Sequence, residues 1–206
     1  MITIVDYGMG NLGSIQNMFK RIGVASRVSS DCSELAESKK ILLPGVGSFD
    51  AAMERINQTG FRDILEHKAL IEKTPILGIC LGMQLMCQSS EEGVLPGLGW
   101  IDAEVKRFNL PVDGVFKIPH MGWNPVEIVK PNPLVAVDMA EQRFYFVHSY
   151  HVVCNRQEDV LATTHHGYHV TAAFNRDNLF GAQFHPEKSH RFGMGLLKNF
   201  AEIESC

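Results

Sequence analysis

The chain has 206 residues, of which 45% are hydrophobic and 20% charged, and its formal net charge is -4. This length suits one domain over residues 1–206, and the negative charge disfavours a general nucleic-acid or anionic-membrane surface. No apolar run reaches the roughly 20 residues of a membrane-spanning helix, and the N-terminus lacks a secretory signal pattern. The five scattered cysteines favour neither a disulfide framework nor a zinc site. We therefore expect a cytoplasmic protein.

The first ninety residues alternate between apolar strand-like segments and helical patterns. Strands are expected at 2–7, 25–30, 39–45 and 75–80, and helices at 11–22, at 50–71 with a break near Gly60, and at 81–90. The expected strands at 39–45 and 75–80 contain apolar runs without polar alternation, which is typical of a parallel sheet covered on both faces. The pattern therefore predicts an α/β fold with a mostly parallel central sheet flanked by helices.

After Gly93 the chain becomes richer in β-forming residues and alternates more. The segments 101–108, 125–130, 143–154 and 160–184 are expected to add antiparallel or mixed strands to the same sheet, and 191–203 to form a closing helix.

A cysteine stands between two glycines where the fourth expected strand ends, in GICLG at residues 78–82. A strand that runs through G-x-C-x-G into a helix is typical of a nucleophile elbow, and the helix N-terminus favours the thiolate of Cys80. A lone cysteine is more often a small buried hydrophobe, and Cys87, within the expected helix, is interpreted in that way.

A reactive thiolate needs a base, and GAQFHPEKS at residues 181–189 supplies His185 and Glu187. Pro186 is expected to keep the chain extended, so that the two side chains point the same way and the carboxylate orients the imidazole. In isolation the pair would be a loop histidine beside a solvated glutamate, but the elbow favours a catalytic pair.

A third segment, LPGVGSF at residues 43–49, could turn peptide N–H groups toward a developing oxyanion. The amide of Leu81, next to the nucleophile, is the candidate second donor. An ordinary strand-to-helix turn would explain the segment equally well.

These motifs together resemble the class I glutamine amidotransferases. With DYGMGNLGS at the N-terminus, KIPHMGWN (117–124), YFVHSYH (145–151) and QFHPEKS (183–189), the chain is similar over its whole length to the glutaminase subunits of imidazole glycerol phosphate synthase, the HisH type. The resemblance implies a Cys80–His185–Glu187 triad that hydrolyses glutamine to glutamate and ammonia without a cofactor or metal. It also implies an oxyanion site formed by Gly45, Val46, Gly47 and Leu81. The substrate site that it implies consists of Gly47, Gln84, His148, Ser149 and Tyr150.

Ammonia released into water is quickly protonated, and this chain has no room for a synthase site, so a partner is implied. In the family the partner is a TIM-barrel cyclase that receives the ammonia in histidine biosynthesis, so the resemblance implies a heterodimer. The expected interface residues are Asn11, Ser14, Met121, Trp123, Asn124, Tyr145 and Lys188. An aromatic beside a methionine suits an interface anchor, although core packing would explain Trp123 equally well.

A different interpretation comes from GMGNLG at residues 8–13, a literal dinucleotide-binding G-x-G-x-x-G between a strand and a helix. Asp31 follows about twenty residues later, as that fingerprint requires. Asn11 and Ser14 are polar where the motif usually packs its helix, and no second nucleotide-binding half follows residue 100. The sequence therefore disfavours a nucleotide cofactor.

Three further interpretations concern the chemistry and the acceptor. A cysteine peptidase shares the elbow, although the glutamate two residues after the histidine favours an amidotransferase. Cys154, His165, His166 and His169 suit a metal by residue type, but ATTHHGYHV (162–170) is typical of a hairpin with solvated histidines. A paralogous glutaminase that supplies ammonia to an amidotransferase of cell-surface sugar biosynthesis would carry the same triad and differ only in the acceptor.

Overall fold

The computed structural model describes residues 1–110, 114–135 and 142–204. Its N-terminal half contains β1 (Ile2–Val5), α1 (Leu12–Arg21), β2 (Ser26–Ser29), α2 (Cys32–Ala36), β3 (Ile41–Leu43), α3 (Phe49–Gln58), α4 (Phe61–Glu66), the π-helical turn η1 (His67–Ile71), β4 (Ile76–Ile79), α5 (Leu81–Leu85) and β5 (Ser89–Ser90). Its C-terminal half contains β6 (Ala103–Arg107), β7 (His120–Pro125), β8 (Glu127–Ile128), β9 (Arg143–His148), β10 (Tyr150–Cys154), the 3-10 turn η2 (Gln157–Asp159), β11 (Val160–His165), β12 (His169–Arg176), β13 (Leu179–Ala182), the 3-10 turn η3 (Pro186–Lys188) and α6 (His190–Glu202).

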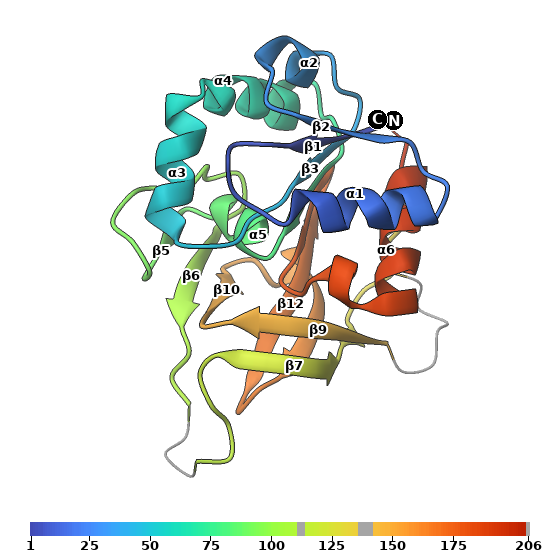
Figure 1. The fold of residues 1–206 in the computed structure, drawn as a ribbon. Coiled ribbons are helices and arrows are strands. Elements are labelled where there is room, and N and C mark those ends of the chain that lie inside the picture. Colours follow the sequence, from blue (N-terminus) through green and yellow to red (C-terminus); the bar gives the residue numbers. More distant parts are fainter. Residues whose placement is uncertain (111–113, 136–141, 205–206) are drawn as a thin grey trace.

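The central sheet has the strand order β2-β1-β3-β4-β13-β12-β11-β8 (Figure 1). Strands β2, β1, β3, β4 and β13 run parallel, and β12, β11 and β8 extend the sheet in antiparallel fashion. The predicted fold class is confirmed. No helix among the described residues combines the length and apolarity that crossing a bilayer requires.

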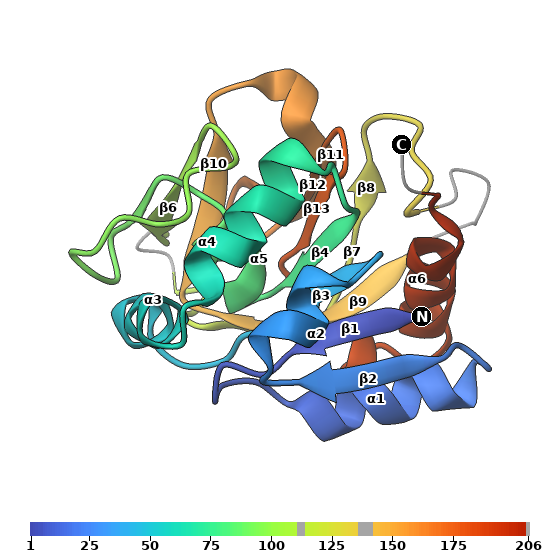
Figure 2. The same cartoon turned by 90° about the horizontal axis from the view of Figure 1, so that it is seen from above.

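Helices cover both faces of the parallel strands, α1 and α6 on one side and α3, α4 and α5 on the other (Figure 2). Successive strand residues enter different layers: Ile4 and Leu42 pack with α1 and α6, whereas Val5 and Ile41 pack with α3 and α4. Because both faces of these strands are buried, their residues do not alternate between apolar and polar, which explains the apolar runs in the sequence.

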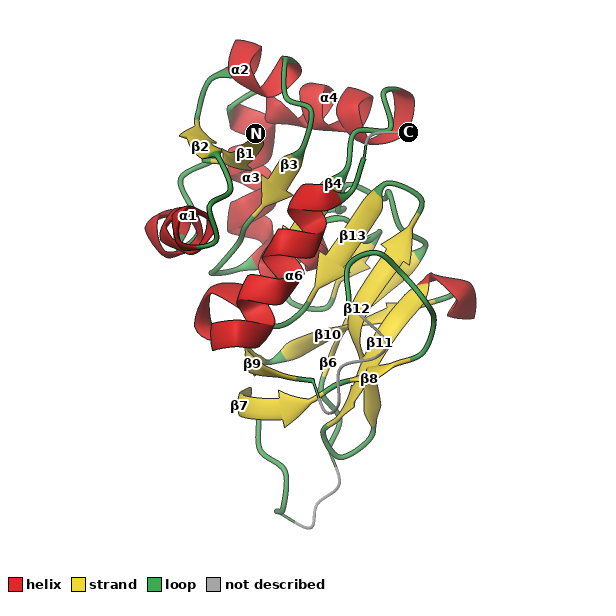
Figure 3. Ribbon diagram, turned by 90° about the vertical axis from the view of Figure 1, so that its right-hand side faces the viewer, coloured by secondary structure: helices red, strands yellow, loops and turns green. Residues whose placement is uncertain are grey.

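The C-terminal half differs from the expectation of one extended sheet. Strands β10, β6 and β5 form a separate sheet, and β7 and β9 form a two-stranded ribbon that lies below the parallel strands of the central sheet in Figure 3. The segment 143–154, predicted as one strand, is split at Ser149. Phe144 and Phe146 pack in the layer of α6, whereas Val152 packs in the opposite layer, and one straight strand cannot reach both.

The helix expected at 81–90 is also shorter, because α5 ends at Leu85 and Ser89–Ser90 pair with β6. Cys87 therefore follows the helix in a turn, where it is fully buried, as expected for a small hydrophobe.

The parallel pairing brings three chain segments to one edge of the sheet. Leu43 of β3 lies beside Gly78 of β4, and Ile79 of β4 lies beside Ala182 of β13. The segments that leave these strands at their carboxyl ends carry the predicted oxyanion loop, Cys80 and His185 respectively.

Candidate active site

Cys80 lies in the tight turn between β4 and α5 with φ 53° and ψ -109°, a positive-φ conformation that is costly for a residue with a side chain. Its amide donates to the Ala182 carbonyl of β13 at 2.7 Å, which fixes the turn. A Cβ on Gly78 would lie 2.6 Å from the Gly82 oxygen, and one on Gly82 only 1.9 Å from the Leu43 oxygen. Both glycines are therefore required for this close approach of backbone segments.

His185 and Glu187 form a buried pair, with Nδ1 2.8 Å from Oε1. A carboxylate only accepts, so Nδ1 carries a proton and Nε2 is left for the thiol. Burial by itself lowers the pKa of His185, but the hydrogen bonds and charges of Cys80 and Glu187 outweigh it and raise that pKa to about 9. The imidazolium is the favoured state at neutral pH, as a proton donor to a leaving amine requires.

The backbone after His185 differs from the expected extended segment. Pro186 opens the 3-10 turn η3, because a proline is well tolerated where no intrahelical N–H is needed. The two side chains meet because Glu187 turns back to the ring, and His185 is anchored by its amide bond of 2.9 Å to the Tyr145 carbonyl.

The predicted oxyanion residues surround Cys80. Val46, Gly47 and Leu81 line the cleft, and Gly45 is packed behind it. Leu81 is the first residue of α5, so its amide has no partner within that helix. Gly47 has φ +108°, a conformation that favours glycine.

Tyr7 braces this loop, although the sequence interpretation did not single it out. Its hydroxyl donates to the Pro44 carbonyl at 2.6 Å, and a Cβ on Gly45 would lie 2.9 Å from the hydroxyl oxygen. Burial and the neighbouring Cys80 raise the pKa of Tyr7 well above its ordinary value. Tyr7 is therefore a neutral hydrogen-bond donor that holds the loop beside the nucleophile.

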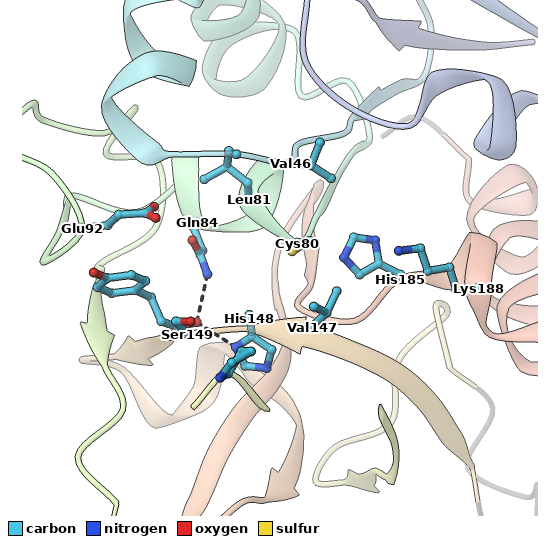
Figure 4. A pocket seen from close by; sticks show the side chains of 13 residues that line it. Val46, Cys80, Leu81, Gln84, Glu92, Val147, His148, Ser149, His185 and Lys188 are labelled. Atoms are coloured by element: carbon cyan, nitrogen blue, oxygen red, sulfur yellow. Dashed lines mark hydrogen bonds between the residues drawn. The ribbon is translucent and has the colours of Figure 1, made fainter. Parts of the chain in front are cut away.

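A cleft of about 410 Å³ opens over Cys80 (Figure 4). Its walls are Val46, Gly47, Cys80, Leu81, Gln84, Glu92, Pro119, Val147, His148, Ser149, Tyr150, His185 and Lys188. All the predicted substrate-binding residues are among them. Glu187 is not, because it lies buried behind His185.

The residues predicted for an interface lie on adjoining elements. Asn11 directly precedes α1 and Ser14 lies within it. The other residues belong to β7 (Met121, Trp123, Asn124), to β9 (Tyr145) and to η3 (Lys188), and η3 lies against both α1 and β9. Met121 is 62% exposed and Trp123 43% exposed, which excludes core packing for Trp123. Trp123 stacks on His190 with ring centroids 5.5 Å apart. Lys188 is both exposed and at the cleft, with its ammonium 5.7 Å from the Tyr145 ring centroid.

The rival motifs have structural explanations. The carboxylate of Asp31 caps α2 by accepting from the amides of Ser33 and Glu34 at 2.8 and 3.0 Å. Because that carboxylate is already used and β2 ends at Ser29, the GMGNLG loop lacks the acidic partner of a dinucleotide site.

No cluster of metal-binding side chains occurs among the described residues. The segment 162–170 lies in a hairpin of β11 and β12, as expected, with His165 opposite His169. The expectation of solvated histidines holds for those two. It is wrong for His166, which stacks on His120 at 4.2 Å because the hairpin packs against β7.

Comparison with known proteins identifies the family of this chain. The family model of class I glutamine amidotransferases matches residues 3–203. The imidazole glycerol phosphate synthase subunit HisH 2 of Methanococcus maripaludis is 50% identical over 200 residues, covering 97% of this chain and 98% of the relative. The chain belongs to the class I glutamine amidotransferases.

Within this family the chain is similar over nearly its full length to HisH subunits. Subunit HisH of Bdellovibrio bacteriovorus is 48% identical, covering 98% of this chain and 100% of the relative, and HisH 2 of Pseudomonas aeruginosa is 46% identical with the same coverage. Among solved structures, a glutamine amidotransferase has a TM-score of 0.72 at 17% identity, covering 98% of this chain and 97% of its own. PurLQS from Thermotoga maritima has a TM-score of 0.70 at 18% identity, covering 97% and 96%. These two structures share the fold.

The geometry also adds residues to the candidate site that sequence reasoning missed. Glu92 brings a carboxylate to the cleft, where its Oε2 accepts from the Phe49 amide at 3.0 Å and burial raises its pKa above the ordinary value. Gln183 points its amide at Cys80, with Nε2 3.7 Å from Sγ. Pro119 and Val147 complete the walls. Gln183 stands in the QFHPEKS motif and could have been found there, whereas nothing around Glu92 distinguishes it from a surface carboxylate.

Proposed function

We propose that this chain is the glutaminase subunit of an imidazole glycerol phosphate synthase and passes ammonia to a cyclase subunit in histidine biosynthesis. The single observation that carries the chemistry is the alignment of a Cys80 elbow of positive φ with a buried His185–Glu187 pair at one cleft. The assignment to this synthase rests on similarity to HisH subunits over nearly the full chain.

In the proposed reaction the Cys80 thiolate attacks the side-chain amide carbon of glutamine. The carbonyl oxygen takes up the negative charge and is stabilised by the Leu81 amide and by a peptide N–H of the 45–47 loop. His185 gives a proton from Nε2 to the amide nitrogen, the C–N bond breaks, and ammonia leaves a γ-glutamyl thioester. A water molecule then attacks the thioester while His185 accepts its proton, and glutamate leaves as the thiol is restored.

The charge of the cleft fits a glutamine bound in one direction. Glu92 lies on the opposite side of Cys80 from His185, with Gln84 between (Figure 4). A carboxylate there suits the substrate's α-ammonium group when the amide end reaches Cys80. We propose that Gln84, Ser149 and Tyr150 contact the substrate between these ends.

The partner is proposed to dock on the face formed by the start of α1, η3 and the β7–β9 ribbon, with exposed Met121 and Trp123 as anchors. This face includes Lys188, which also lines the cleft, so ammonia leaving Cys80 has a short way to the interface.

The test measures glutamate released from glutamine by the purified chain, alone and with a cyclase subunit and its nucleotide-sugar ligand. Strong stimulation by cyclase and ligand, abolished in Cys80→Ala, supports the proposal. The surface-sugar acceptor stays the second candidate, because the same triad would supply ammonia to either acceptor. No stimulation, with Cys80 still labelled by a glutamine-like electrophile, would favour that second acceptor.

A further inference from the structure

A continuous hydrogen-bond network begins on the β7–β9 ribbon. The Asn124 side-chain nitrogen lies 2.8 Å from the His165 carbonyl and 3.0 Å from His120 Nε2. His120 Nδ1 lies 3.0 Å from His148 Nε2, and His148 Nδ1 lies 2.8 Å from the Tyr150 carbonyl. The antiparallel register of β7 and β9, which places His120 opposite His148, brings the two rings together.

The carbonyl at one end fixes the direction of every bond. Tyr150 O can only accept, so His148 Nδ1 carries the proton and His148 Nε2 accepts from His120 Nδ1–H. His120 Nε2 then accepts from the amide of Asn124, whose two hydrogens are both used. Both imidazoles are thereby Nδ1–H tautomers.

The network continues from the same carbonyl to the nucleophile. Gln84 Nε2 donates to Tyr150 O at 3.1 Å and to Gln183 Oε1 at 3.0 Å. With its oxygen engaged, Gln183 turns Nε2 toward Cys80 Sγ at 3.7 Å. Gln183 is fully buried, and Gln84 is 4% exposed. The amide of Gln183 is thus held so that an N–H faces the sulfur.

The two histidines are neutral in this arrangement. Burial, with the neighbouring His166, lowers the pKa of His120 to about 4. Burial likewise lowers the pKa of His148 to about 3, although the Tyr150 carbonyl opposes it. An imidazolium at His148 would turn its Nε2–H toward the Nδ1–H of His120 across a 3.0 Å contact. An imidazolium at His120 would turn its Nε2–H toward the amide N–H of Asn124 across a contact that is also 3.0 Å long.

We propose that Asn124, His120, His148, Gln84 and Gln183 form a positioning relay that holds an N–H donor on the Cys80 sulfur and couples it to strand β7. The coupling rests on the proposed function, in which a partner docks on Met121 and Trp123 of this strand. A chain pressing on β7 shifts the first bond of the relay, and the shift reaches the donor at Sγ. His120 and Gln183 are positioning residues, since they act on the substrate only through other groups.

The test measures the rate at which iodoacetamide alkylates Cys80 in the full chain, with the adduct located by mass spectrometry. Gln183→Met keeps the length of the side chain but removes the donor, and is expected to slow alkylation about tenfold, as loss of a hydrogen bond to a charged sulfur would. His120→Phe keeps the ring that stacks on Phe146 and is expected to slow alkylation about threefold through the loosened relay.

His166→Phe is the matched control. It keeps a ring stacked on His120 and removes the hydrogen bond to the Lys117 carbonyl, which lies outside the relay, so alkylation at the wild-type rate is expected. Wild-type rates in both Gln183→Met and His120→Phe, with unchanged thermal unfolding midpoints, would overturn the proposal.

A measurement on the unmodified chain covers the case in which a variant does not fold. Nitrogen-15 spectra of the imidazoles are expected to show His120 and His148 as neutral Nδ1–H tautomers at pH 6, and an Nε2–H tautomer at either would overturn the relay.

Neither test needs glutamine or a partner. Failure of the proposed function would appear as absent glutamate release with a relay still intact, whereas failure of the relay would leave partner-stimulated glutaminase activity unaffected.

Discussion

Gly82→Ala should damage both the fold and the site, because the second glycine of the elbow has no room for a side chain. The new Cβ would lie 1.9 Å from the Leu43 carbonyl oxygen, and that oxygen must withdraw by at least 1.1 Å to reach even 3.0 Å. Leu43 cannot move alone, since it ends β3 and pairs with Gly78 of β4. We expect a loss of about 3 kcal/mol in the free energy of unfolding, at the upper end for an overpacked core.

The same displacement acts on catalysis, because Leu43 leads directly into the loop that carries Gly45 and Val46. A shift of about 1 Å in a positioning segment can cost about a hundredfold in rate, and we expect a loss of that order in cyclase-stimulated glutamate release. The assays are urea unfolding followed by circular dichroism and steady-state glutamate production.

Gly195→Ala in α6 is the matched control, since nothing lies within 4 Å of its added Cβ. The same substitution there should stabilise the chain by about 0.5–1 kcal/mol through helix propensity. If the free energy of unfolding of Gly82→Ala lies within about 0.5 kcal/mol of the wild-type value, the close approach of β3 and α5 is wrong.

The remaining predictions concern the triad and the interface. Cys80→Ala should abolish glutamate release while leaving the unfolding midpoint and the affinity for the cyclase largely unchanged; retained turnover would remove Cys80 as nucleophile. Glu187→Gln should lower kcat about a hundredfold or more with little change in KM, because the imidazolium of His185 loses its charged partner; unchanged kcat would contradict the buried pair. Although burial opposes it, the pKa of His185 is raised from 6.5 to about 9, so its stabilising contribution should be full below about pH 6.5 and be lost as the pH rises through about 9. Urea unfolding of the wild type and of Glu187→Gln across pH 6 to 10 measures this contribution. If the free energies of unfolding of the two proteins change with pH in parallel, the contribution of the pair is refuted. Trp123→Ala should raise the Kd for the cyclase about tenfold with little effect on unfolding, and an unchanged Kd by calorimetry would exclude it from the interface.

The parallel half of the fold was predictable because its information is local. The strands Ile2–Val5, Ile41–Leu43 and Ile76–Ile79 are buried and almost wholly apolar because both of their faces are covered, and the glycines around Cys80 mark a turn that little else permits. The order of the motifs then placed the triad residues at one sheet edge.

The mixed half was less predictable because its pairings join distant segments. Nothing near Ser149 announces that 143–154 divides between two sheets, since the break follows from packing against two different layers. The contact between His120 and His148 arises from the β7–β9 register, across 28 residues. Glu92 reaches the cleft through its bond to the α3 N-terminus, which a linear pattern cannot reveal.

The most direct test of the Cys80 assignment is covalent labelling by a diazoketone analogue of glutamine in the presence of the cyclase, with the adduct mapped by mass spectrometry. The other cysteines of the chain serve as internal controls, including Cys32, exposed on α2, and Cys87 and Cys154, whose thiol pKa values burial raises. We predict one adduct, on Cys80, which excess glutamine prevents and which fails to form in Cys80→Ala. Labelling of another cysteine, or labelling of Cys80 that glutamine does not reduce, would contradict the assignment of this cleft as a glutaminase site.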